Sequence, residues 1–180
     1  SFLSPFSYSK LIGDKENYIF LILFVALILR LAAFFAFSPW EANVEAEYII
    51  KADAELYHNH ALKILNQEYP YSDRVSPGFP YLLAFVYFVF GIKPWLVLLL
   101  NIMFNVLNVY LVYKLAKLLF GGSIALISSA LLAFDTHQII FTQTLLTDTI
   151  FALLIVTSIL FIVKSTKDLE VKNLIVAGSA

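Results

Sequence analysis

The stretch YIFLILFVALILRLAAFFAF, residues 18–37, decides the fold class of this chain. A helix needs about 20 mainly apolar residues to cross a hydrocarbon core of about 30 Å. Residues 18–37 supply that length with one charge, Arg30. The whole chain has the same character, because 61% of its residues are hydrophobic and 14% are charged, against about 45–50% and about 25% in soluble domains. We therefore predict an all-α membrane protein.

Three further apolar runs have the length of a membrane span, and basic, glycine or threonine residues separate them. Together with residues 18–37 they predict four transmembrane helices. The runs are residues 95–113, 124–141 and 145–163, and the helices predicted from them are residues 95–118, 123–142 and 145–164. Residues 171–180 read as the start of a fifth helix, and the chain begins at Ser1 rather than at Met. We therefore expect a fragment that is truncated in a fifth helix.

The apolar segment at residues 79–90 is too short to cross. It lies between a Pro-Gly pair and Gly91, and as a helix it would reach only about 18 Å. Runs of 10–14 apolar residues are typical of interfacial or re-entrant segments, and the tyrosines Tyr81 and Tyr87 suit a headgroup-level position. We expect this segment to be a juxtamembrane helix within one long loop, residues 38–94.

The distribution of lysines favours an orientation with the N-terminal segment, residues 1–17, in the cytoplasm. The loop of residues 38–94 then lies on the outer, periplasmic or extracellular side. A rival model has residues 79–90 crossing and the N-terminus outside, and counting basic residues does not separate the two models. The short length of residues 79–90 favours the first. The lysines placed inside are Lys10, Lys15, Lys114, Lys117, Lys164, Lys167 and Lys172.

Composition also limits the chemistry. The net charge is −1 and the chain has no cysteine. No basic surface is expected to hold nucleic acid, and neither a disulfide nor a thiol nucleophile can form. Any catalysis must therefore use carboxylates and the three histidines.

Asp53 opens the stretch ADAELYHNHALKILNQ, which predicts an amphipathic helix over about residues 53–67. One face carries Tyr57 and Ala61 with Ile64 and Leu65, and the other carries Glu55, His58, Asn59 and Asn66. Asp53 has two interpretations. It is either an N-cap that accepts from free backbone N–H groups, or a general base held at the membrane surface.

Other polar residues in the apolar runs also have two interpretations each. Asp148 opens the run at 145–164, where the helix dipole favours an acid, yet acids in spans are candidates for function. For Asp135 the choice is between a structural, hydrogen-bonded role and a role in a site. Arg30 either snorkels to the interface or pairs with an anion. Asn101, Asn105 and Asn108 share one face and are expected to join helices.

The two remaining patterns are weak indications of a site. His58 and His60 are two residues apart, so they point to different faces of a helix and make a poor metal pair. Several tyrosines of the outer loop suit an interfacial belt or a sugar pocket. These are Tyr48, Tyr57, Tyr69, Tyr71, Tyr81 and Tyr87.

The order of these features resembles a known family. One span is followed by the motif from Asp53 to Tyr57, then by RVSPGFPYLLAF at residues 74–85, then by Gly91. This resembles the N-terminal membrane module of the GT-C glycosyltransferases, especially the relatives of protein O-mannosyltransferases and of the lipid A aminoarabinose transferase. The resemblance covers about residues 18–180 and includes the Thr147-Asp148 pair.

The resemblance implies roles for specific residues. Asp53 would be a catalytic base, or a ligand of substrate or metal, and Asp148 would be the second acid of the site. Arg74 would contact the lipid phosphate of the donor. Glu55 and Tyr57, in the same motif as Asp53, are candidate substrate-binding residues. Many relatives have two successive acids where this chain has Asp53-Ala54, so a divalent metal on Asp53 and Asp148 is an open question.

The sequence therefore predicts a membrane glycosyltransferase, present as a fragment that is inactive alone. It would transfer a sugar from a polyprenyl-phosphate donor to an acceptor on the outer face, with membrane lipids and the rest of the chain as its partners. The alternative is a non-catalytic helical scaffold or a lipid-binding assembly subunit. Asp53 and Asp148 lie on the same side of the membrane in the first case, and opposite sides would exclude it.

Overall fold

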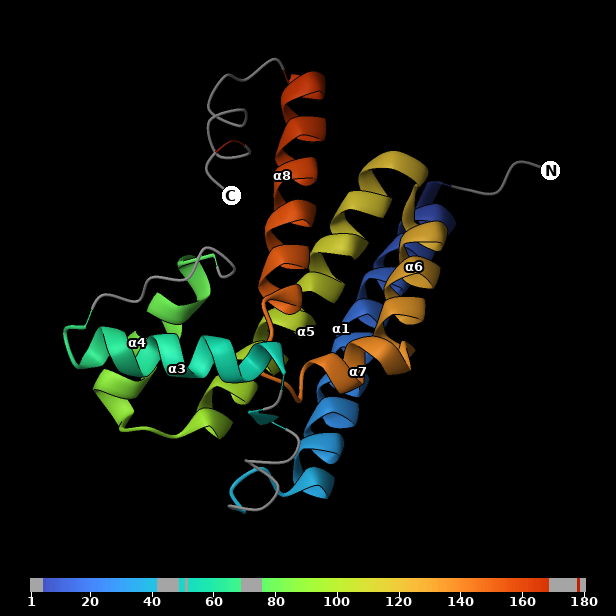
Figure 1. Cartoon of the computed structure of the whole chain (residues 1–180). Helices are drawn as coiled ribbons and strands as arrows, with labels where there is room; N and C mark the ends of the chain where they lie inside the picture. The colour runs from blue at the N-terminus through green and yellow to red at the C-terminus, as the bar shows by residue number, and fades with distance from the viewer. Residues whose placement is uncertain (1–4, 42–48, 51, 69–75, 169–177, 179–180) are drawn as a thin grey trace. The chain divides into compact units, whose positions relative to one another are not determined.

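The computed structural model describes residues 5–41, 49–50, 52–68, 76–168 and 178 of the chain, and within residues 5–16 and 167–168 only the backbone. The described residues form helices joined by turns (Figure 1), as the prediction of an all-α protein requires. The helices are α1 (Pro5–Phe37), α3 (Asp53–Leu65), α4 (Gly78–Phe90), α5 (Pro94–Phe120), α6 (Gly122–Phe134), α7 (Thr136–Phe141) and α8 (Asp148–Asp168). Most of residues 171–180, the predicted start of a fifth span, lies outside the described residues.

Three of the four predicted spans are long apolar helices. Among the described residues, those with the length and hydropathy to cross a membrane are Asn17–Phe37, Pro94–Phe120 and Asp148–Thr166. The first belongs to α1, which begins at Pro5 and therefore extends well before residue 18. The prediction of helices at 53–67 and 79–90 is confirmed by α3 and α4, which differ from it by no more than two residues at either end.

The predicted third span is interrupted. Residues 123–142 were expected to form one helix, but α6 ends at Phe134 and α7 begins at Thr136. Between them Asp135 has an extended backbone, with φ −63° and ψ 110°. Asp and Thr side chains compete with helical hydrogen bonding, which explains why the apolar run breaks at this pair. The count of four spans therefore stays a prediction.

The chain divides into two compact units, which are described separately. The first contains Ser1–Leu29, Phe104–Asp135 and Phe151–Ala180. The second contains Arg30–Met103 and Thr136–Ile150. Asp53 and Asp148 both belong to the second unit, so the candidate site can be built within it.

In the first unit, two buried clusters define how α1, α5 and α6 run. One cluster contains Ile19, Tyr113, Ala116 and Ala125, and the other contains Ala26, Val109 and Ala133. From the first cluster to the second, the chain runs forward along α1 and α6, because the residue numbers rise. Along α5 the residue numbers fall, so the chain runs backward. Helices α1 and α6 therefore run in the same direction, and α5 runs in the opposite one.

Small residues make this packing close. Ala125, Ser129 and Ala133 are fully buried and repeat at every fourth position of α6, so they share one face. Stripes of small residues let helix backbones approach in membrane proteins. The opposite side of α6 exposes Ile127 and Leu131, with 59% and 70% of each residue accessible, as expected for a surface that faces lipid.

In the second unit, aromatic residues mark the end of α1. The ring of Trp40 lies 5.9 Å from those of Phe34 and Phe35, and tryptophan is enriched where a span meets the membrane interface. Later in the chain, α3 and α4 pack on each other (Figure 1). The ring of Tyr57 meets that of Phe79 edge-on at 5.2 Å.

Gly91, which follows α4, has a backbone conformation open almost only to glycine, with φ 81° and ψ 168°. Such conformations cost other residues about 1–3 kcal/mol. Gly91→Ala should therefore lower the thermal unfolding midpoint of the purified protein. Gly78→Ala is the matched control, because an added Cβ there meets nothing within 4 Å and the glycine lacks a positive φ. Equal midpoints for the two variants would contradict this account of the turn.

Candidate functional site

Asp53 is the first residue of α3, and its side chain is exposed. The N-cap position belongs to Ala52, and no side-chain hydrogen bond caps the helix. The interpretation of Asp53 as an N-cap is therefore wrong. One residue inside the helix, its carboxylate gains only from the helix dipole and remains available for another role. Glu55 is exposed in the same first turn. Tyr57 is half-buried against Phe79, so its ring also supports the packing of α3.

Asp148 is the first residue of α8 and is exposed. Its place in the first turn agrees with the prediction from the sequence. Arg74, the expected phosphate ligand, lies outside the described residues.

A polar turn, Thr142-Gln143-Thr144, leads from α7 towards Asp148, and its hydrogen bonds close the end of α7. The hydroxyl of Thr142 donates to the carbonyl of Ile139 at 2.7 Å, and that of Thr144 to Phe141 at 3.0 Å. Both bonds satisfy carbonyls that a helix end leaves without partners. Thr142 is fully buried and Gln143 is 5% exposed, so this turn lies inside the protein.

The polar turn forms hydrogen bonds with two long apolar helices, α1 and α5. Asn101 Nδ2 of α5 donates to the carbonyl oxygen of Thr144 at 3.1 Å. Gln143 Nε2 donates to the carbonyl oxygen of Arg30 in α1 at 3.3 Å. Arg30 lies about two turns before the end of α1, and Asn101 about two turns after the start of α5, each roughly 10 Å along its helix. The end of α1 and the start of α5 therefore lie at the same end of this unit.

The expectation that the asparagine stripe joins helices stays a prediction, because Asn101 joins α5 to a turn. Asn105 and Asn108 are buried as well. Snorkelling of Arg30, in contrast, is wrong. Arg30 is fully buried, whereas a snorkelling side chain reaches water. The other interpretation, in which the guanidinium of Arg30 has a partner, agrees with its burial, because a buried charge requires one.

Sequence reasoning missed Gln143. This residue links α1 to the turn that precedes α8. The pattern that could have indicated this role is the polar triplet Thr142-Gln143-Thr144 between two apolar runs. The Oε1 atom of Gln143 and the Oδ1 atom of Asn101 are buried without a hydrogen-bond partner, and each such acceptor costs about 1–3 kcal/mol.

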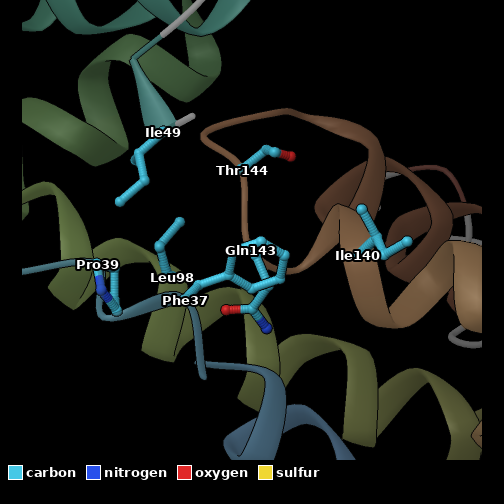
Figure 2. Close-up of a pocket in the computed structure, with 7 residues that line it drawn as sticks. All are labelled: Phe37, Pro39, Ile49, Leu98, Ile140, Gln143 and Thr144. Carbon is cyan, nitrogen blue, oxygen red and sulfur yellow. The ribbon is translucent and has the colours of Figure 1, made fainter. Parts of the chain in front are cut away.

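A cavity of about 240 Å³ lies beside the polar turn (Figure 2). Apart from the turn, its walls are hydrocarbon and aromatic. An apolar cavity of about 150 Å³ already accepts benzene, so this space fits a hydrocarbon segment. The lining residues are Phe37, Pro39, Ile49, Leu98, Ile140, Gln143 and Thr144.

His58 differs from its predicted place on the polar face of the helix. It is half-buried, and its Nδ1 atom lies 2.9 Å from the hydroxyl of Tyr87 in α4. Burial lowers the pKa of His58 below its usual value of 6.5, because the charged ring loses hydration. The apolar face itself is confirmed, since Ala61 is buried and Ile64 half-buried.

The described side chains do not assemble a metal site. No three His, Asp or Glu residues among them lie close enough to hold an ion together. Asp53 and Asp148 remain single carboxylates in this arrangement.

Asp53 and Asp148 are each the first residue of a helix in this apolar, helical protein. Residues 74–180 match the family model described as dolichyl-phosphate-mannose-protein mannosyltransferase. The chain belongs to this family, and it is a membrane glycosyltransferase module of the GT-C type. No curated protein and no solved structure gave a match.

Proposed function

We propose that this chain forms the front part of the active site of a glycosyltransferase that uses a polyprenyl-phosphate sugar on the outer face of the membrane. The observation that carries the proposal is the family match over residues 74–180. The test is transfer of a labelled sugar from a polyprenyl-phosphate donor by the complete protein. Transfer from a nucleotide sugar alone, in the absence of lipid-linked sugar, would contradict it.

In the proposed reaction an acceptor hydroxyl or amide attacks the anomeric carbon, and the bond from that carbon to the lipid phosphate breaks. Asp53 takes the proton of the acceptor as general base. The lipid phosphate leaves as an anion, which needs little help from an acid. Arg74 stabilises that anion by charge-assisted hydrogen bonds. Attack opposite the leaving phosphate inverts the anomeric centre.

The position of Asp148 supports its proposed role as a second acid of the same site. The polar turn before Asp148 contacts Arg30 near the end of α1, and α1 leads to the loop that carries Asp53. Since Asn101 near the start of α5 contacts the same turn, the loop between α1 and α5 starts and ends at one side. A glycosyltransferase requires Asp53 and Asp148 to lie on the same side of the membrane. A scaffold has no such requirement.

The cavity supports a lipid-linked donor. It lies between the end of α1, the start of α5 and the polar turn, and its apolar walls match a hydrocarbon chain rather than a sugar. Glu55 and Tyr57 are proposed to bind the polar part of a substrate, next to Asp53.

The proposed topology has α4 lying on the outer surface without crossing. The chain has no natural cysteine, so single cysteines at Ser76 and Ser123 report sidedness directly. We expect a membrane-impermeant maleimide to label Ser76→Cys in intact cells and Ser123→Cys only in inverted vesicles. Labelling of both from the same side would exclude the four-span topology with a surface α4.

A further inference from the structure

Helix α3, which carries Asp53, has little of its own to fix it in place. It has 13 residues, and helices shorter than about 12–15 residues are marginal in water without tertiary contacts. Its N-cap residue, Ala52, offers no side-chain hydrogen bond and has φ 56°, a conformation that is uncommon outside glycine. The orientation of Asp53 must therefore come from packing further along the helix.

That packing is concentrated one turn after Asp53, where two adjacent residues reach α4. Tyr57 packs edge-on against Phe79 at 5.2 Å between ring centroids. His58 lies 5.5 Å from the ring of Tyr87, in addition to its 2.9 Å hydrogen bond. The two contacts thus meet α4 near its beginning and near its end. They fix both the position of α3 and its rotation about its own axis.

The direction of the hydrogen bond depends on the tautomer of His58. Tyr87 is 2% exposed, so its hydroxyl needs a partner inside the protein. In the Nε2–H tautomer of neutral His58, the Tyr87 hydroxyl donates to Nδ1. A protonated His58 carries a hydrogen on Nδ1 and can only donate to the Tyr87 oxygen, so the direction of the bond would have to reverse.

We propose that His58 is a positioning residue, which fixes α3 on α4 through its hydrogen bond to Tyr87 and thereby holds the Asp53 carboxylate in place. This inference rests on the proposed role of Asp53. His58 touches neither substrate nor reacting atoms in this scheme. It acts through the helix, one turn away from the acid.

The latch, meaning the docking of α3 on α4 through the His58–Tyr87 hydrogen bond, should weaken in acid. Because burial lowers the pKa of His58, the undocked helix binds a proton more readily than the docked helix. Docking is thus strongest above about pH 6.5 and weakens as the pH falls below this value. Helix α4 brings no charged side chain to the contact, only Tyr81 and Tyr87 as titratable groups, and Glu55 is the neighbouring charge on α3.

Tyr87→Phe tests the latch, since it removes the hydroxyl and keeps the ring. In the complete protein we expect turnover to fall about tenfold with little change in KM for the donor, and backbone hydrogen exchange in α3 to accelerate. Tyr81→Phe is the matched control, because Tyr81 belongs to the same helix but is 56% exposed. It should change neither quantity.

His58→Gln distinguishes a positioning role of His58 from a purely structural one. The amide oxygen of the glutamine can still accept a hydrogen bond from Tyr87, but the amide does not titrate. It should retain most of the turnover at pH 7. After correction for the slower intrinsic exchange of amides in acid, it should also lack the loss of protection in α3 that we expect of the wild type between pH 7 and pH 5.5. Unchanged exchange in Tyr87→Phe would overturn the latch. Faster exchange with unchanged turnover would overturn its role in positioning Asp53. Absence of sugar transfer by the wild type would contradict the proposed function but not the latch. Backbone hydrogen exchange in α3 would still show whether the latch exists.

Discussion

Asp53→Asn should reduce turnover with a polyprenyl-phosphate sugar by roughly 10²-fold or more, because an amide cannot accept the proton that a general base must take. The same change should leave folding almost intact. Ala52 occupies the cap position and no side-chain bond caps α3, so the substitution loses only the interaction of the charge with the helix dipole, about 0.3–1 kcal/mol. Turnover and thermal stability are the two measurements.

The control for Asp53→Asn is Glu68→Gln, which neutralises an exposed acid just after the same helix. It should preserve turnover. Near-normal turnover in Asp53→Asn would remove the general base from the scheme and favour the scaffold interpretation. A large loss of stability would instead show that the carboxylate has a structural role that the exposed position of Asp53 does not predict.

Arg74→Ala should weaken binding of the donor by roughly 10–150-fold, which corresponds to a charged hydrogen bond of about 1.5–3 kcal/mol. The reason is that a neutral side chain cannot replace the guanidinium at a phosphate. Stability should change little. Lys93→Ala is the matched control, since it removes a second basic residue of the same loop, and Lys93 is exposed. Equal donor affinity in the two variants would reduce Arg74 to an ordinary loop charge.

Local sequence patterns predicted the helices well where a single period or composition decides the structure. The amphipathic pattern after Asp53 gave α3 within about two residues, and the twelve apolar residues before Gly91 gave α4. The failure at Asp135 has a physical cause, because hydropathy measures whether a segment prefers lipid and is insensitive to one residue whose backbone leaves the helix. The run remained apolar while the helix broke.

The site was harder to predict, because its organisation depends on contacts between distant segments. Gln143 and Arg30 are 113 residues apart in sequence, and nothing in either neighbourhood indicates that they meet. His58 was assigned to solvent by its helical position, but α4 covers it and supplies Tyr87. Asp53 and Asp148, in contrast, were predicted to open helices, and both do.

The central claim is that Asp53 and Asp148 serve one donor site on the outer face. Its most direct test is labelling of single cysteines at these two positions in intact cells with a charged, impermeant thiol reagent, with and without added polyprenyl phosphate. The account predicts that both Asp53→Cys and Asp148→Cys are labelled from outside and that the lipid phosphate slows both reactions. Labelling from opposite sides of the membrane, or rates that the lipid leaves unchanged at both positions, would contradict it.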